Sequence, residues 1–182
     1  MKIERKWAIP SHNTFSQPPI KKLIQEEIID GVIIDPFAND SKIAHITNDL
    51  DPQFDTDYHL DAIDFLKTFD NESVEMVLFD PPYSVRQVSE VYRRLGKTVN
   101  METTQCTYWS NLKNEVVRIL KPGGKVISFG WNSSGMGKSR GFKTSRILLV
   151  NHSGYHNDTI CVVDVKVQSS LFSHGLATTV RN

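Results

Sequence analysis

The stretch that decides the fold reads VLFDPPYSVRQ, residues 77–87. Three apolar residues lead into an acid and two consecutive prolines, and a proline has no N–H group to donate to the ladder of a sheet. A strand that ends at Asp80 must therefore leave the sheet at once and carry Tyr83 to its rim. In open α/β sheets, ligands bind at the rim formed by the carboxyl ends of the strands. We therefore expect a ligand site around Asp80 and Tyr83.

Strands and helices alternate on both sides of this stretch. Short apolar runs predict seven strands, over 32–35, 44–49, 58–61, 75–80, 125–130, 145–151 and 158–167. Helical spacing of apolar residues predicts helices over 18–31, 62–69, 84–96 and 106–120. In the third of these, Ser84 would be the cap, and the residues facing inward would be Val85, Val88, Val91, Tyr92 and Leu95. The alternation predicts a doubly wound, mainly parallel α/β sheet of seven strands, and the final hairpin without a helix predicts an antiparallel last strand.

The composition is that of an ordinary globular chain. Of the 182 residues, 39% are hydrophobic and 23% are charged, and the formal net charge is zero, so nucleic acid would have to bind through local basic patches. The length favours one domain over residues 1–182. The two cysteines, Cys106 and Cys161, form no paired-cysteine motif, which argues against a disulfide framework and against a zinc ribbon. No apolar run approaches the about 20 residues of a membrane span, and the first residues lack the apolar core of a signal peptide. We therefore expect a cytoplasmic protein with no metal and no membrane contact.

Four predicted strands end in an acid, at Asp35, Asp49, Asp61 and Asp80. One such aspartate is commonly a turn former or a helix cap. Parallel strands would gather all four carboxylates on one rim, where they repel one another unless a metal or a donor-rich ligand lies among them. The spacing favours a ligand: Asp49 could bind a ribose diol, Asp61 could accept from an adenine amino group, and Asp35 could face an ammonium group. S-adenosylmethionine carries all three groups.

Several motifs resemble those of one enzyme family. DPPY at 80–83 resembles the catalytic motif of the S-adenosylmethionine-dependent DNA adenine N6-methyltransferases. DPFAND at 35–40 is similar to their first cofactor motif, DAIDFL at 61–66 to their third, and NTFSQPPIKKLI at 13–24 to a segment that approaches the methionine part of the cofactor. The match covers roughly residues 7–167, and the chain resembles the short members found in phages and prophages. The resemblance implies a Rossmann-like class I methyltransferase fold and a location in the bacterial host cytoplasm.

The resemblance also implies which residues form the site. The cofactor would lie against Thr14, Phe15, Asp35, Pro36, Phe37, Asp49, Asp61 and Ala62. The catalytic turn that holds the target base would consist of Asp80, Pro81, Pro82 and Tyr83. The chain departs from the family pattern at Asn39 and Asp40, since family members usually carry glycines in this motif, as in DPFAGSG. We expect no separate target-recognition domain, because only about 40 residues separate Tyr83 from Gly123. A homodimer or a separate specificity subunit stays open.

Amino-methyl transfer explains why such a turn is needed. The amino nitrogen of adenine is a poor nucleophile because its lone pair is delocalised into the ring. Asp80 can accept a hydrogen bond from one amino hydrogen and the Pro81 carbonyl from the other, which favours a tetrahedral, reactive nitrogen. Tyr83 offers a flat face for stacking. The base must be flipped out of the duplex or arrive single-stranded.

Two basic segments predict contact with the phosphates of DNA. The loop over 133–146 contains Lys138, Arg140 and Lys143 and no acid, and we expect it to open on the same rim as the catalytic turn. Arg86 follows the turn on a helix. A solvated loop and ordinary helix surface charge, with Glu90 paired to Arg94, remain the alternatives. For the function, the alternatives are an RNA base methyltransferase acting on guanine N2 or adenine N6, and a non-catalytic methyltransferase-like subunit.

Overall fold

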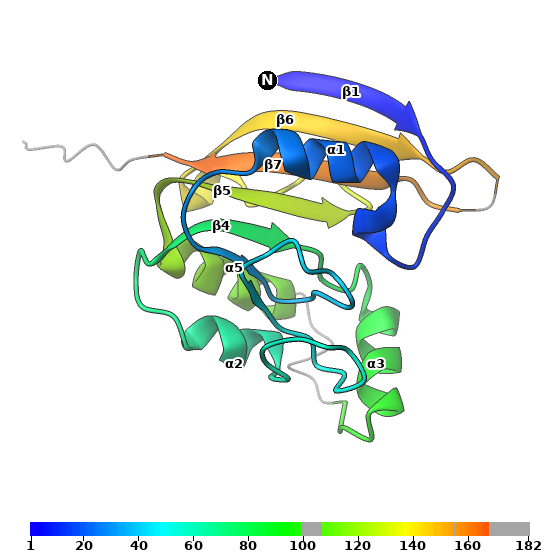
Figure 1. Cartoon of the computed structure of the whole chain (residues 1–182), viewed down its shortest axis with the longest axis vertical. Helices are drawn as coiled ribbons and strands as arrows, with labels where there is room; N and C mark the ends of the chain where they lie inside the picture. Colours follow the sequence, from blue (N-terminus) through cyan, green and yellow to red (C-terminus); the bar gives the residue numbers. More distant parts are fainter. Residues whose placement is uncertain (100–106, 155, 168–182) are drawn as a thin grey trace, which may run out of the picture.

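The computed structural model describes residues 1–99, 107–154 and 156–167. A seven-stranded sheet runs through the molecule in the order β1-β6-β7-β5-β4-β2-β3 (Figure 1). The strands are β1 (Lys2–Trp7), β2 (Ile33–Asp35), β3 (Ile46–Thr47), β4 (Val74–Phe79), β5 (Leu120–Gly130), β6 (Phe142–Asn151) and β7 (Thr159–Lys166). Only β7 runs against the others, because it pairs antiparallel with both β5 and β6 while the remaining pairs are parallel. The predicted α/β class and the antiparallel last strand are therefore confirmed.

Helices cover both faces of the sheet. They are α1 (Pro18–Glu27), α2 (Ala62–Lys67), α3 (Val85–Arg94) and α5 (Thr107–Ile119), with short 3-10 turns η1 (Thr14–Ser16) and η2 (Lys138–Arg140). Successive strand residues face different helices: Met76 packs in the cluster that contains α1, whereas Val77 packs in the cluster that contains α2, α3 and α5. Alternation along buried strands therefore produces two apolar cores, one on each side of the sheet.

Local sequence signals explain where the helices begin. Pro18 and Pro19 occupy the first turn of α1, where a missing N–H group costs nothing. The Ser84 hydroxyl accepts a hydrogen bond from the N–H of Gln87 at 3.3 Å, which caps α3 as predicted. Asp61 caps α2 in the same way, through the N–H of Ile63 at 3.1 Å.

The sheet has seven strands as predicted, but one predicted segment is not a strand and another segment takes its place. The segment 58–61 is not a strand: Tyr58 makes a single parallel bridge to Asn48. The reason is that the side chain of Asn48, and not the main chain of a neighbouring strand, binds the main chain of Leu60. Its Oδ1 accepts from the N–H of Leu60, and its Nδ2 donates to the carbonyl of Leu60. The seventh strand is instead β1, at the edge beside β6, which the sequence did not predict.

Two smaller predictions are wrong. The helix expected over 18–31 ends at Glu27. Val85 does not face inward, since 41% of it is exposed, because it lies in the first turn of α3 before that helix meets the core. Residues 100–106, which include Cys106 and the start of the helix expected over 106–120, lie outside the described residues. In the described part of the chain, no helix has the length and apolar character needed to cross a membrane.

Candidate active site

The carboxyl ends of β2, β3 and β4 meet at a cavity of about 420 Å³. Ten of the residues predicted for the site line it: Thr14, Pro36, Phe37, Asp49, Asp61, Ala62, Asp80, Pro81, Pro82 and Tyr83. Two do not. Asp35 is fully buried at the end of β2, and Phe15 is buried with its ring 4.8 Å from that of Phe129. Segments far apart in the sequence therefore meet at one rim, as the strand-end acids predicted.

The turn after β2 contains a residue other than glycine in the left-handed region. Asn39 has a φ of 48°, in the left-handed region that glycine adopts freely and asparagine adopts more readily than most other residues. Its N–H donates to Oδ2 of Asp49 at 3.0 Å, and Oδ1 of Asp49 accepts from the N–H of Asp51 at 2.9 Å. Burial raises the pKa of Asp49. Asn39 and Asp49 therefore hold a tight turn against the cavity.

The deepest acid has an unused oxygen. Oδ1 of Asp35 accepts from the N–H of Phe37 at 3.0 Å, whereas Oδ2 is buried and has no hydrogen-bond partner among the described residues. Burial, followed by the nearby charges of Asp80 and Asp49, raises the pKa of Asp35 well above its ordinary value. A buried acceptor without a donor is costly, so a ligand that brings a donor would stabilise this carboxyl group.

Asp61 already has two donors. Besides capping α2, it accepts a hydrogen bond at Oδ2 from the hydroxyl of Tyr92 on α3. Burial, followed by this hydrogen bond, raises the pKa of Tyr92, so the hydroxyl keeps its proton at neutral pH. Arg94 forms an ion pair with Asp51 at 2.8 Å, which ties α3 to the loop after β3 across the cavity. A ligand at Asp61 must therefore share the carboxylate with Tyr92.

Three hydrogen bonds fix the turn over 80–83. The Tyr83 hydroxyl donates to Oδ1 of Asp80 at 2.5 Å, and the Tyr83 N–H donates to Oε1 of Gln87 at 2.6 Å. The indole N–H of Trp109 donates to the carbonyl of Pro82 at 2.9 Å. No described residue donates to the Pro81 carbonyl, which stays available as an acceptor.

Asp80, the acid of the turn, has a raised pKa. Burial raises its pKa to about 6, and hydrogen bonds from Tyr83 and Thr14 partly offset that effect. Its carboxyl group nevertheless borders the cavity. A strongly shifted carboxyl group in a cleft is typical of a functional site.

A second cavity, of about 500 Å³, lies on the β5 side of the same turn. It shares Pro81, Pro82 and Tyr83 with the first cavity and adds residues from the end of β5, including Ser128 and Trp131. The rings of Tyr83 and Trp131 meet edge to face, with centroids 5.5 Å apart and planes at 72°. The hydroxyl of Ser128 is buried without a partner among the described residues. The turn thus separates an acid-rimmed cavity from an aromatic one.

Comparison with solved structures identifies the fold. TrmN from Thermus thermophilus superposes with a TM-score of 0.54 at 17% identity, over 83% of this chain and 49% of TrmN. HI0767 of Haemophilus influenzae, named as a candidate methylase, superposes with a TM-score of 0.50 at 11% identity, over 82% of this chain and 94% of that chain. The chain has the fold of a Rossmann-like methyltransferase.

A weaker likeness, with a TM-score of 0.40 and 18% identity, links 59% of this chain to 52% of a candidate DNA modification methylase from Thermus thermophilus, and nothing is inferred from it. No protein-family model and no curated protein matches the sequence. The chain spans about half the length of TrmN.

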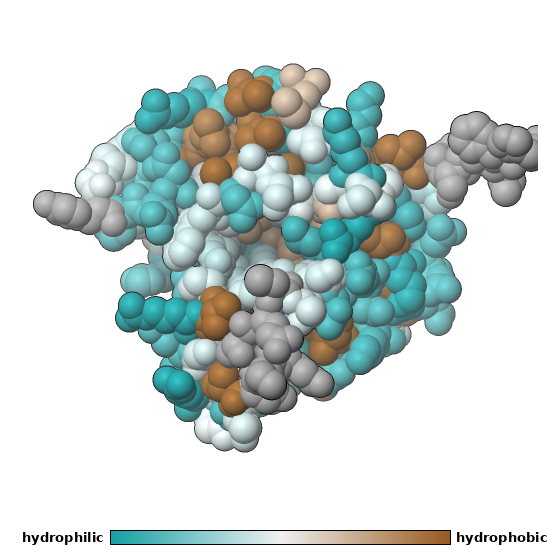
Figure 2. Space-filling model, turned by 180° about the vertical axis from the view of Figure 1, so that it is seen from behind, coloured by the Kyte–Doolittle hydropathy of each residue, from teal (hydrophilic) through white to brown (hydrophobic). Residues whose placement is uncertain are grey.

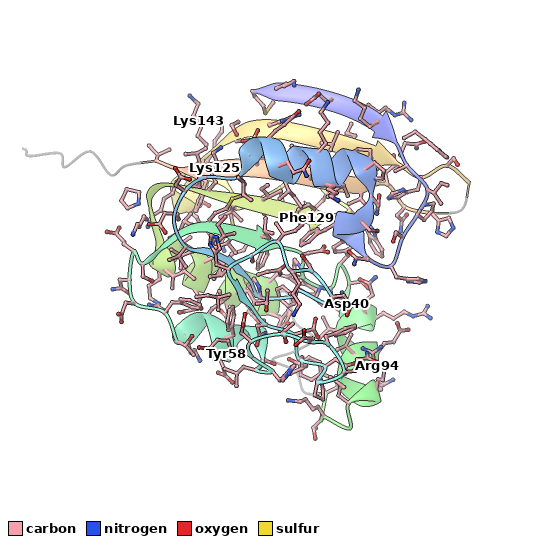
Figure 3. The ribbon with its side chains drawn as sticks, in the orientation of Figure 1. Asp40, Tyr58, Arg94, Lys125, Phe129 and Lys143 are labelled. Carbon is pink, nitrogen blue, oxygen red and sulfur yellow. The ribbon has the colours of Figure 1, made fainter. Side chains whose placement is uncertain are left out.

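The structure places one of the predicted phosphate-binding residues, Lys143, away from the rim. Lys143 pairs across β7 at the level of Lys125, five residues before Gly130 at the rim, which corresponds to about 16 Å along the strand. Figure 3 shows Lys143 and Lys125 near one end of the strands and Phe129 nearer the other. The loop after β5 therefore leaves the rim and returns to the opposite end of the sheet, because it feeds a strand parallel to β5.

The other three predicted phosphate-binding residues differ in whether their side chains are already bound within the protein. Arg140 donates to Asn114 at 3.0 Å and to Ser110 at 2.9 Å, so it is anchored on α5. Arg86 forms an exposed ion pair with Glu90 at 2.7 Å, so the pairing expected between Glu90 and Arg94 is not formed. Lys138 is exposed in η2.

Sequence reasoning missed several residues that shape the site. Gln87 lies four residues after Tyr83, a spacing that would have suggested a contact within the turn and first helical turn. Asn48 precedes a strand-end acid and could have been noted as part of the rim. Trp109 and Tyr92 reach the site from elements whose packing no local pattern reveals. Among the described residues, no three histidine, cysteine, aspartate or glutamate side chains gather as a metal site would require.

Proposed function

We propose that this chain transfers a methyl group from S-adenosylmethionine to the exocyclic N6 of adenine in DNA, and that residues 1–182 act as one catalytic domain. The observation that carries the proposal is the pair of cavities that share the wall formed by Pro81, Pro82 and Tyr83. Methyl transfer between two bound molecules requires two adjoining sites with the reacting groups aligned at their boundary. The methyltransferase fold supports the same class of reaction.

The residues of the acid-rimmed cavity fit this cofactor. Its volume of about 420 Å³ suits a ligand of this size. Asp49, which follows β3 and lines the cavity, suits a ribose diol. Asp35 is buried next to Pro36, which lines the cavity, and its Oδ2, without a partner among the described residues, could accept from an ammonium group only if the lining opens around it. Phe37 adds an apolar wall. When bound, S-adenosylmethionine supplies an electrophilic methyl group carried on a sulfonium.

The turn supplies two acceptors for an amino group. Above pH 6, Asp80 is mainly ionised and can accept one hydrogen bond, and the carbonyl of Pro81, to which no described residue donates, can accept another. Two acceptors draw the amino nitrogen towards a tetrahedral geometry and expose its lone pair to the methyl group. The three hydrogen bonds that fix the turn keep both acceptors in position before the base arrives.

The aromatic cavity suits an unstacked base. Tyr83 and Trp131 form an aromatic corner that can replace part of the stacking lost when a base leaves the duplex. The Tyr83 hydroxyl binds Asp80 at 2.5 Å, so entry of the amino group must share or displace this bond. The choice of DNA adenine over other bases rests on the resemblance of the motifs at 35–40, 61–66 and 80–83 to those of the adenine N6-methyltransferases.

The test supplies the protein with methyl-labelled S-adenosylmethionine and, separately, single-stranded DNA, double-stranded DNA, RNA and protein. We expect label in DNA, more rapidly in the single-stranded form, and no label with the Asp80→Asn variant. Label in RNA alone would replace the proposal by the RNA base methyltransferase. Absence of label in every substrate, with the cofactor bound, would point to a non-catalytic subunit.

A further inference from the structure

Strand β1 carries an apolar stripe on its exposed face. Ile3 and Trp7 are each 60% exposed, and Ile9, just beyond the strand, is 71% exposed. Glu4 lies on the other face, because its carboxylate accepts from Arg146, which also bonds Glu26 and Glu27 of α1. Since side chains alternate along a strand, Ile3 and Trp7 point away from α1.

The stripe continues across the sheet. Ile3 pairs with Ile147 and Arg5 with Leu149 on β6, and Leu149 in turn pairs with Ile160 on β7. The three residues on β6 and β7 are partly exposed. Figure 2, which views the molecule from behind Figure 1, shows hydrophobic side chains gathered on the upper part of this face, where β1 and β6 lie. Arg5 lies between Ile3 and Trp7 on this face, and the apolar residues that three strands gather around it mark an interaction surface.

Within residues 1–99, 107–154 and 156–167, the outer edge of β1 pairs with no other strand. The N–H of Ala8 donates to the carbonyl of Asn151 on β6 at 3.1 Å. Main-chain groups of successive strand residues point to alternate sides, so those of Ile3, Arg5 and Trp7 point to the free edge. An unpaired edge with exposed apolar side chains is a template for another strand.

We propose that two copies of this chain pair through β1, antiparallel and with the two-fold axis at Arg5, so that the two sheets become one. In this register Ile3 lies opposite the partner's Trp7, and Glu4 lies opposite the partner's Lys6. Both pairs occur twice, which favours a second copy over an unrelated partner.

Neighbouring registers fit less well. A shift of one residue places residues whose main-chain groups point to the free edge opposite residues whose main-chain groups point to β6. The hydrogen bonds between the two strands then cannot form. A shift of two residues in one direction sets Lys2 opposite Lys6 and Glu4 opposite itself, both like-charged pairs. A shift of two residues in the other direction sets Lys6 opposite itself and Glu4 opposite Ala8, so the Glu4–Lys6 pairs are lost. In the proposed register, the one like-charged pair is Arg5 opposite Arg5, and each guanidinium lies diagonal to a Trp7 ring on which it can stack.

The geometry has a consequence for catalysis. The strand β1 runs parallel to β4, whose carboxyl end carries the catalytic turn. Antiparallel pairing of β1 therefore directs the two rims to opposite sides, so that one short duplex cannot reach both sites at once. We expect each protomer to act independently.

Analytical ultracentrifugation over a concentration series tests the surface, whatever reaction the chain catalyses. The wild type should show a monomer–dimer equilibrium, Ile3→Lys should raise the dissociation constant at least tenfold, and Ile28→Lys should leave it unchanged. Ile28 is the matched control because it is an isoleucine 45% exposed at the end of α1, and α1 covers the face of the sheet opposite to Ile3. A wild type that stays monomeric up to about 0.5 mM, or equal effects of the two variants, would overturn the proposal.

A cross-link tests the register. Opposed residues of a hydrogen-bonded antiparallel pair have Cα atoms about 5.5 Å apart, within the range that a disulfide spans. Mild oxidation should therefore link two chains of the Arg5→Cys variant and not two chains of the Ile28→Cys variant. Failure of Arg5→Cys to link, while the wild type dimerises, would refute pairing through this edge.

Discussion

Replacing Asp80 by asparagine should stabilise the protein while abolishing methyl transfer. The substitution keeps the size of the side chain and an acceptor for the Tyr83 hydroxyl, and it removes a charge that the fold holds at a cost. Burial raises the pKa of Asp80 from 3.8 to about 6. Each unit of pKa corresponds to about 1.4 kcal/mol, so the ionised carboxylate destabilises the folded state by about 3 kcal/mol.

The stabilisation should depend on pH in a defined direction. The folded state holds the proton more tightly than the unfolded chain, so the cost is present in full above about pH 6 and disappears as the pH falls below about 4. We therefore expect Asp80→Asn to raise the free energy of unfolding by about 3 kcal/mol at pH 8, and by less than about 1 kcal/mol at pH 4.

Urea denaturation of both proteins between pH 4 and pH 8 measures this difference, provided that the two unfolding curves share one m-value. A gain that is the same at pH 4 and pH 8 would mean that removal of the charge is not the cause. A loss of stability at pH 8 would refute the inference that the structure holds Asp80 in a costly ionised state. Methyl transfer by the same variant should be undetectable, because the amide cannot replace the carboxylate as an acceptor of this strength.

Three further substitutions test other parts of the site. Asn39→Gly should change the free energy of unfolding by only a few tenths of a kcal/mol. Asn39→Ala should lower it by about 1 kcal/mol, because a φ of 48° is unfavourable for alanine. Equal effects of the two substitutions in denaturation experiments would contradict this reason. Trp109→Phe removes the donor to the Pro82 carbonyl and should slow transfer by up to about tenfold without changing cofactor affinity, so a loss of affinity in calorimetry would count against a role in the turn. Tyr92→Phe frees Oδ2 of Asp61 and should tighten cofactor binding severalfold, and calorimetry that shows unchanged affinity would remove Asp61 from the cofactor site.

The sequence predicted the fold wherever a segment carries its own signal. The apolar run before Asp80 predicts a buried central strand, and the prolines at 18 and 19 and Ser84 mark helix starts that the structure confirms. Strand β1 carries no such signal, since four of its six residues are charged and it is held by pairing with β6 and by the contacts of Arg146. The segment 58–61 has the composition of a strand, but its pairing depends on the side chain of Asn48.

The site was predictable to the extent that strand ends define it. Parallel strands bring Asp49 and Asp80 to one cavity, whereas Asp61 reaches it as the cap of α2 and not as the end of a strand. Lys143 shows the limit of that reasoning, because a loop that starts at the rim can end at the other side of the sheet. The hydrogen bond from Trp109 to Pro82 joins residues 27 positions apart, and only packing of α5 against the turn reveals it.

The most direct test of amino-methyl transfer at the turn is to identify the methylated atom. A single-stranded oligonucleotide with one adenine, incubated with S-adenosylmethionine and excess protein, is digested to nucleosides and examined by mass spectrometry. A matched oligonucleotide carries purine, which lacks the exocyclic amino group, in place of the adenine. We predict N6-methyldeoxyadenosine from the first and no methylated nucleoside from the second. Methylation of another nucleoside, or of a ring nitrogen in both oligonucleotides, would contradict a reaction in which Asp80 and the Pro81 carbonyl hold an exocyclic amino group.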